Sequence, residues 1–221
     1  MMVRLDARGA AGAALAAALL VTGCGGSGKD DGQPDSGTHD RAKTLTQAEI
    51  KAVLPQASDL PGSKRNSSTV LDLSAGSDKR PCAGGQLGKC VAAKGVGTTV
   101  LTKEGEGDFS FTVFAHRDTE AARNAYPFLW KDAATAWIIP PEKAEVGSPG
   151  DQSGARRGEH NDGLGSYIQI RVGPTLLTIK TSSGVAHEPH TDKQLKELAE
   201  MFTQRARQAH DGDSPTASLR G

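Results

Sequence analysis

Histidines are the residues of this chain whose spacing comes closest to a chemical site, in the run His187-Glu188-Pro189-His190. Two imidazoles three residues apart can meet one metal ion on a helix, and His160 could join them from another loop. Pro189 and the helix expected to begin just after His190 instead place the pair in a loop, where exposed histidines are commoner than ligands. We therefore predict no metal site and no cofactor.

Recognised catalytic motifs do not occur in the sequence. It contains no Gly-x-Ser-x-Gly, no His-Glu-x-x-His, no Walker loop and no complete Gly-x-Gly-x-x-Gly. The sequence also lacks the excess of basic residues that is usual in nucleic-acid-binding proteins. Its 26 Lys and Arg are balanced by 26 Asp and Glu, and the basic residues form no cluster. We expect a protein that is not an enzyme and binds no nucleic acid. A metal-dependent hydrolase using His187 and His190 is the alternative that the histidines leave open.

Two further groups of side chains suit ligand binding. Arg156, Arg157 and Arg171 could clamp an anion, since guanidinium groups match carboxylates and phosphates, although an exposed polar strand face explains them equally well. Tyr126, Trp130 and Trp137 share one helix face, where they form either core packing or one wall of an apolar cleft. We take Tyr126, Trp130, Trp137 and Arg171 as the candidate ligand-binding residues.

The N-terminus has the pattern of an export signal. Arg4 and Arg8 precede an uncharged apolar run at residues 9–21, and small residues follow. The run is too short to span a bilayer, which needs about 20 apolar residues. The junction Val21-Thr22-Gly23-Cys24 resembles a bacterial lipobox, whose cysteine becomes the first mature residue and carries lipid. The alternative is an Ala-rich helix that happens to contain a cysteine.

The lipobox resemblance implies where the protein works. Residues 1–23 would be a cleaved lipoprotein signal peptide, and Cys24 would carry diacylglycerol and palmitate-type acyl chains that anchor the chain to the extracytoplasmic face of the cell membrane. The following residues, 24–43, are rich in Gly, Ser, Asp and Pro and nearly devoid of apolar side chains. Such a segment cannot bury enough surface to fold, so we expect a flexible linker there.

Cys82 and Cys90 then form an even pair. In an oxidising compartment we expect them to be joined in a disulfide, which would constrain the unfolded chain by about 2.5 kcal/mol. Their spacing is not Cys-x-x-Cys, and further ligands for zinc do not stand nearby.

Residues 44–210 have the pattern of one α+β domain. Capping boxes at Thr46/Glu49 and Thr191/Gln194 start an opening and a closing helix, and a third helix begins at Asp118 or Thr119. Pro127 should kink or break that third helix. Short turns join alternating segments, which predicts a central antiparallel sheet of about five strands with flanking helices. The expected strands are 68–73, 97–102, 108–115, a possible edge strand at 154–159, 167–172 and 175–180. Residues 211–221 are expected to be a disordered tail.

Several short motifs together resemble known cell-envelope proteins. They are the opening helix that ends in Ala-Ser-Asp-Leu-Pro-Gly, a cysteine-bearing loop, the hairpin into Asp118-Thr-Glu-Ala-Ala122, Ile170-Arg-Val-Gly173 and the closing helix. In this the chain resembles actinobacterial (Streptomyces-like) envelope lipoproteins, which are similar to the extracellular sensor domain of mycobacterial receptor serine/threonine kinases. The resemblance implies a central antiparallel sheet with flanking helices, a ligand cleft and no enzymatic activity. This chain has one available cysteine pair where the kinase sensors typically have two.

These observations predict an exported, membrane-anchored lipoprotein whose domain binds or senses a small ligand or lipid. The alternative is a protein-binding accessory module for an envelope enzyme or transporter. The first predicts an enclosed apolar cleft, and the second predicts a flat exposed apolar patch.

Overall fold

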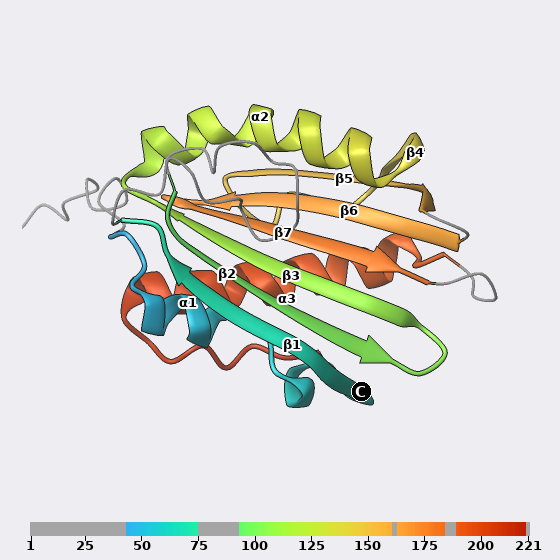
Figure 1. Cartoon of the computed structure of the whole chain (residues 1–221), viewed down its shortest axis with the longest axis horizontal. Coiled ribbons are helices and arrows are strands. Elements are labelled where there is room, and N and C mark those ends of the chain that lie inside the picture. The colour runs from blue at the N-terminus through green and yellow to red at the C-terminus, as the bar shows by residue number, and fades with distance from the viewer. Residues whose placement is uncertain (1–42, 75–92, 161–162, 184–188, 220–221) are drawn as a thin grey trace, which may run out of the picture. The chain divides into compact units, whose positions relative to one another are not determined.

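One antiparallel sheet of seven strands organises the residues that the computed structural model describes, namely 43–74, 93–160, 163–183 and 189–219. All of them belong to one unit, Ser36–Gly221. Across the sheet the strand order is β1-β2-β3-β7-β6-β5-β4 (Figure 1). The strands are β1 (Ser63–Asp72), β2 (Ala93–Lys103), β3 (Gly107–His116), β4 (Ile139–Ala144), β5 (Gln152–His160), β6 (Gly163–Val172) and β7 (Thr175–Ser182).

The α+β class and the antiparallel sheet are confirmed, but the sheet has seven strands where the sequence predicts about five. β4 was not predicted, because Pro140 and Pro141 lack the N–H group that a strand ladder uses. The structure tolerates them at an edge, where β4 pairs only with β5 and the register shifts between Ile139 and Glu142. The strand expected at 154–159 lies in β5, one position in from that edge.

The predicted β2–β3 hairpin is confirmed, and its turn depends on glycine. Gly105 and Gly107 have φ angles of 79° and 90°, a region that other residues rarely adopt. A Cβ at Gly107 would also lie 1.9 Å from the carbonyl oxygen of Ser182, whereas a Cβ at Gly105 would meet nothing within 4 Å. Gly107 therefore lets the hairpin approach the end of β7.

Both predicted capping boxes are present. Thr46 caps α1 (Gln47–Val53) and Thr191 caps α3 (Asp192–Asp211), and each threonine hydroxyl accepts a hydrogen bond from the backbone N–H three residues on, at Glu49 or Gln194. A single 3-10 turn, η2 (Ala57–Asp59), follows α1. These caps satisfy N–H groups that a helix start otherwise leaves unpaired.

The predicted break at Pro127 does not occur, since α2 (Thr119–Trp137) continues through it. Pro127 is on the exposed side of α2, so the carbonyl oxygen that loses its partner faces water. The opposite side buries Ala122, Ala125 and Leu129. Packing against the sheet therefore holds the helix together across the proline.

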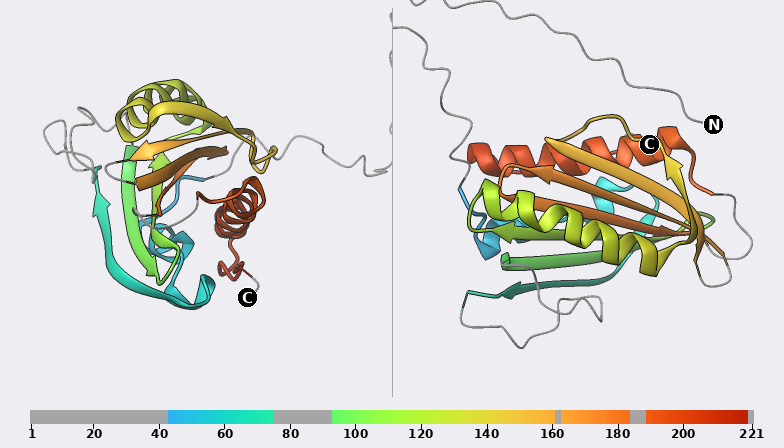
Figure 2. Two further views of the ribbon diagram at one scale, coloured as in Figure 1. Left: turned by 90° about the vertical axis from the view of Figure 1, so that its right-hand side faces the viewer. Right: turned by 90° about the horizontal axis from the view of Figure 1, so that it is seen from above.

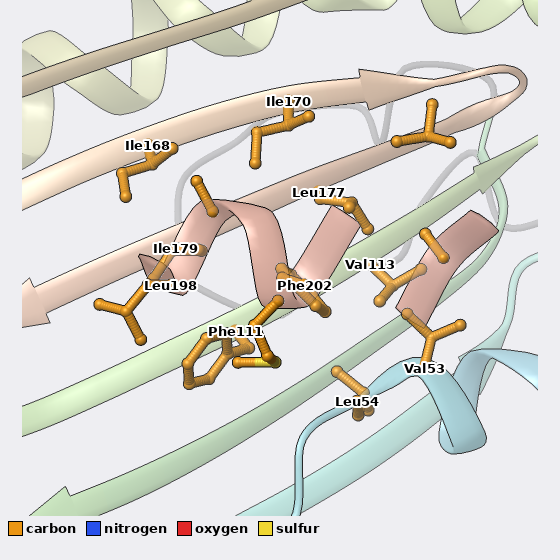
Figure 3. Packing of buried hydrophobic residues seen from close by; sticks show 14 of the residues in the cluster. Val53, Leu54, Phe111, Val113, Ile168, Ile170, Leu177, Ile179, Leu198 and Phe202 are labelled. Carbon is orange, nitrogen blue, oxygen red and sulfur yellow. The ribbon is translucent and has the colours of Figure 1, made fainter. Parts of the chain in front are cut away.

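The helices cover the two faces of a curved sheet. Figure 2 shows the sheet bending around α3, with α1 on the same side and α2 on the other. The main core fills the concave side (Figure 3). Its centre pairs Phe111 of β3 with Phe202 of α3 edge to face, with ring centroids 5.3 Å apart. The side chains drawn there include Val53, Leu54, Val113, Ile168, Ile170, Leu177, Ile179 and Leu198, each at most 2% exposed.

The segment after α3 differs from the disordered tail expected at 211–221. Gly212 closes the helix with a φ of 86°, and the backbone N–H of Thr216 donates to the side-chain oxygen of Gln208 at 2.9 Å. The N–H of Leu219 donates to the carbonyl of Asp59, also at 2.9 Å. Residues 212–219 thus lie against α3 and η2.

Several predictions concern residues outside the described ranges. They are the signal peptide at 1–23, Cys24, nearly all of the linker at 24–43, Cys82, Cys90 and His187.

Candidate functional site

A groove lies at the edge of the sheet formed by β4 and β5, beside α2. It has a volume of about 630 Å³, is open to solvent, and has a mixed polar and apolar lining. Its floor comes from β4 and β5, the following residues Glu145 to Gly147 also line it, and Trp130 of α2 contributes to its wall. The lining residues are Trp130, Pro141, Lys143, Ala144, Glu145, Val146, Gly147, Ser153, Gly154, Ala155 and Arg156.

Trp130 is held in the groove wall by the strands beneath it. Its ring centroid lies 5.7 Å from that of Tyr167 on β6, with the two planes tilted by 48°. A Cβ at Gly154 would lie only 3.0 Å from Cη2 of the indole, so the absence of a side chain there gives the ring its place against β5. The indole is therefore fixed on its sheet side while it lines the groove.

Arg156 brings a positive charge to the same wall. The carbon at the centre of its guanidinium group lies 4.6 Å from the centroid of the Trp130 ring, a cation–π contact. Arg157, the next residue, projects to the other face of the sheet and forms an ion pair with Asp192 at the start of α3. Alternation along β5 thus separates the two arginines, and only Arg156 lines the groove.

Tyr126 belongs to a buried hydrogen-bond network rather than to the groove. Its hydroxyl donates to the backbone carbonyl of Gln169 at 3.3 Å, and the Gln169 side-chain amide donates to the carbonyl of Tyr126 at 2.6 Å. The Tyr167 hydroxyl donates to the Gln169 side-chain oxygen at 2.7 Å. Burial raises the pKa of Tyr126 to about 12 and that of Tyr167 further, so both phenols stay protonated. This network ties α2 to β6.

Arg171 is also occupied by internal contacts. It is 7% exposed, and its guanidinium donates to the Asp151 carboxylate at 2.9 Å and to the Gln152 side chain at 2.7 Å. The same Asp151 oxygen accepts the backbone N–H of Gly173 at 2.8 Å. Arg171 therefore ties the start of β5 to the β6–β7 turn and is not placed to clamp a ligand.

Trp137 lies at the end of α2, apart from the groove lining. The ring of His160 stacks on it with centroids 3.5 Å apart, and Nζ of Lys180 lies 4.5 Å from the indole centroid. A ring nitrogen of His160 also lies 2.9 Å from the Trp137 carbonyl, at the helix end where carbonyls lack partners within the helix. Burial lowers the pKa of Lys180. These contacts close the end of α2 against β5 to β7.

Of the four predicted ligand-binding residues, the structure thus places only Trp130 in the groove. Arg156, whose anion-binding potential is visible in the sequence, lies beside it. Lys143 and Glu145 were missed because they belong to β4 and its exit, where two prolines hide the strand. Residues 141–145, Pro-Glu-Lys-Ala-Glu, do not alternate between apolar and polar side chains, so the sequence carries no strand signal there.

His190 does not reach toward solvent as a ligand would. It is 5% exposed and packs edge to face on Phe109, with ring centroids 5.0 Å apart, and burial lowers its pKa. Among the described residues no cluster of three or more His, Cys, Asp or Glu is placed to hold a metal ion. Within the same ranges, none of the helices has the length and apolar character needed to cross a membrane.

Comparison with known proteins identifies a fold and no family. The chain matches no protein-family model and no curated protein. Among solved structures it is similar to the extracellular domain of PknH from Mycobacterium tuberculosis, with a TM-score of 0.52 and 6% identity over 78% of this chain and 100% of that one. It also matches a GTP-binding regulator from Thermotoga maritima, with a TM-score of 0.35 and 12% identity over 80% of this chain and 97% of that one. The first likeness supports the expected resemblance to a kinase sensor domain at the level of fold.

Proposed function

We propose that this chain is a non-enzymatic binding protein whose α2/β4–β5 groove holds a small ligand. The proposal depends mainly on the position of Trp130. This large aromatic side chain lines an open groove, and its other side packs against Gly154 and Tyr167 of the sheet. Fixed aromatic walls with a few polar groups are the usual make-up of small-molecule sites. A volume of about 630 Å³ suits a ligand of that size.

The lining of the groove favours binding over catalysis. The described lining residues include no histidine and no cysteine. Ser153 donates its hydroxyl proton to the carbonyl of Gly147 at 2.9 Å, and Glu145 is paired with Lys143 at 2.7 Å. A nucleophile with an adjacent base is therefore not assembled there.

The proposed setting is the outer face of the cell membrane. Cys24 would carry the lipid anchor after removal of residues 1–23, and residues 24–43 would tether the domain, with a mean reach of about 25 Å. Support comes from the lipobox-like junction and from the fold likeness to an extracellular domain. Cys82 and Cys90 would be disulfide-bonded in that compartment, which mass analysis after thiol alkylation would test by finding no label on either.

A protein-binding accessory module is the alternative. Among the described residues the large exposed hydrophobic side chains are Phe128 at 44% and Ile139 at 66% exposure. Two such residues do not make the broad apolar patch that a protein interface of this type presents. The groove therefore favours the small-ligand function.

Indole NMR signals test the ligand-binding function, because the chain has two tryptophans. We would label the exported chain with ¹⁵N, assign each indole N–H by Trp130→Phe and Trp137→Phe, and add a small-molecule extract of the producing cell envelope. The proposal expects the Trp130 signal to shift and the Trp137 signal to stay. Equal shifts of both signals, or none, would contradict it.

A further inference from the structure

Two positive charges lie directly opposite each other on the floor of the groove. Lys143 of β4 and Arg156 of β5 are register partners in the antiparallel ladder. Both line the groove, so their side chains share one face of the two strands. Like charges at such positions destabilise a strand pair. An anion bound between the two side chains would offset this unfavourable arrangement.

The charge of Arg156 is not offset within the described structure. Lys143 has a carboxylate partner, Glu145 at 2.7 Å, although their side chains are 81% and 66% exposed and water screens the pair. By contrast, no described carboxylate lies within salt-bridge distance of Arg156, whereas Arg157 pairs with Asp192 and Arg171 with Asp151. Among these three arginines, Arg156 is the one left to meet a charge from outside.

The Arg156 side chain is also held in position before any ligand binds. Contact with the Trp130 ring restricts the guanidinium at the groove wall, so less side-chain freedom is lost when an anion binds. Apolar surface lies beside the cations, at Trp130 and Pro141, which line the same groove. A ligand that fits both parts has a negative group joined to an apolar body.

We propose that the groove binds a small organic anion, with its carboxylate or phosphate between Arg156 and Lys143 and its apolar part against Trp130 and Pro141. This inference rests on the proposed ligand-binding function and adds the chemical class of the ligand. A guanidinium group donates two parallel hydrogen bonds to either anion, and the ammonium group of Lys143 adds a second charge. Binding would also relieve the repulsion between the opposed cations.

The test uses Trp130 as a single fluorescent reporter, in the exported chain carrying Trp137→Phe. The probes are phenyl phosphate, benzoate, inorganic phosphate and uncharged benzyl alcohol. We expect the two aromatic anions to bind at least about tenfold more tightly than benzyl alcohol, since a charge-assisted pair contributes roughly 1.4 kcal/mol or more. Inorganic phosphate should bind more weakly than phenyl phosphate because it lacks the apolar part.

Charge-removing variants locate the site. Arg156→Gln should weaken phenyl phosphate binding about tenfold and leave benzyl alcohol unchanged. Lys64→Gln is the matched control, because Lys64 is an exposed lysine on β1 at the opposite edge of the sheet. It should leave both affinities unchanged. Equal loss of phenyl phosphate binding in the Lys64 and Arg156 variants would overturn the assignment to the groove.

Competition with lipid vesicles shows whether the anion is a lipid headgroup or a free molecule. If phosphatidylglycerol vesicles, and not phosphatidylcholine vesicles, compete with phenyl phosphate for the wild-type chain and fail with Arg156→Gln, the anion is a lipid headgroup. If vesicles do not compete, the ligand is a free organic anion.

Failure of this inference differs from failure of the proposed function. Benzyl alcohol binding as tightly as the anions, with no effect of Arg156→Gln, would overturn the anionic class and leave the groove as a binding site. No binding of any probe, together with unmoved indole signals in the NMR experiment, would overturn both.

Discussion

The guanidinium group of Arg205 on α3 lies 3.1 Å from the carboxylate of Asp59 in η2, and both side chains are largely buried, at 4% and 15% exposure. Arg205 also donates to the backbone carbonyls of Val53 at 2.9 Å, Ala52 at 2.8 Å and Ala217 at 2.9 Å. One side chain thus joins the end of α1, η2 and the C-terminal segment. These contacts, which join residues far apart in the sequence, explain why residues 212–219 pack against α3 and η2.

Replacing Arg205 should therefore be costly. Arg205→Met would leave three carbonyls without the guanidinium that donates to them and a largely buried carboxylate without its cation, and we expect a loss of about 3–5 kcal/mol in the free energy of unfolding. Urea denaturation measures it. Arg123→Met is the control, because Arg123 is exposed on α2 and should change stability by less than about 0.5 kcal/mol. Equal effects of the two substitutions would contradict this account of the C-terminal segment.

Acid should destabilise the fold through His116. This side chain is 1% exposed, and neither ring nitrogen has a hydrogen-bond partner among the described residues. Burial lowers its pKa from 6.5 to about 4, against the opposing effect of the Asp118 carboxylate. Between these values the unfolded chain binds the proton and the folded one does not, so stability falls as the pH drops, by up to about 3 kcal/mol.

The test of His116 compares how steeply the free energy of unfolding changes with pH in two chains, rather than its value at one pH. We would measure urea denaturation between pH 7 and pH 4 for the wild-type chain and for His116→Leu. The variant should lose less stability over this range, because one proton-binding difference has gone. Other acid-sensitive groups, including the buried His190 and His210, are common to both chains. If the free energy of unfolding falls equally steeply with pH in both chains, His116 is not the cause of the acid destabilisation.

The β2–β3 hairpin gives a prediction with an internal control. Gly105→Ala places a side chain at positive φ in open space, which costs about 1–2 kcal/mol. Gly107→Ala adds a collision with the backbone carbonyl of Ser182, and we expect a total loss of roughly 3 kcal/mol. Thermal unfolding of the two variants compares them. A smaller loss for Gly107→Ala than for Gly105→Ala would show that the hairpin does not approach β7 as described.

Local sequence signals predicted much of the fold. Thr46 with Glu49 and Thr191 with Gln194 each satisfy a helix start within four residues, so neighbours in sequence were sufficient to find them. The glycine turn of the β2–β3 hairpin is equally local. β4 escaped prediction because Pro140 and Pro141 are compatible with a strand only at a sheet edge, and edge position is set by the whole topology. The continuity of α2 through Pro127 likewise depends on the sheet that packs beneath it.

The candidate site was predictable only in part for a related reason. Residue type and helical spacing pointed to Trp130, but they pointed equally to Tyr126 and Trp137, whose partners Gln169 and His160 lie on other elements. Arg171 and Arg156 looked alike in sequence. They differ in their partners: Arg171 has the carboxylate of Asp151 beside it, and no described carboxylate lies within salt-bridge distance of Arg156. That difference arises from contacts between residues far apart in the sequence.

Membrane attachment is testable through Cys24. Cys24→Ala should move the protein from the membrane fraction to the soluble exported fraction, because the sulfur that we propose to carry the lipid is lost. Cys82→Ala is the control and should stay with the membrane. Cell fractionation followed by immunoblotting distinguishes the two. Retention of the Cys24 variant in the membrane fraction would exclude the lipobox interpretation.

The central claim is that the groove beside Trp130 carries a small ligand, and native mass spectrometry tests it most directly. Residues 25–221 would be exported, purified without detergent and measured as the wild-type chain, Trp130→Ala and Trp137→Phe, after circular dichroism has shown that all three are folded. We predict one discrete added mass on the wild-type and Trp137→Phe chains, and its loss from Trp130→Ala. An unmodified mass for the wild-type chain, or an added mass that survives Trp130→Ala, would contradict the claim.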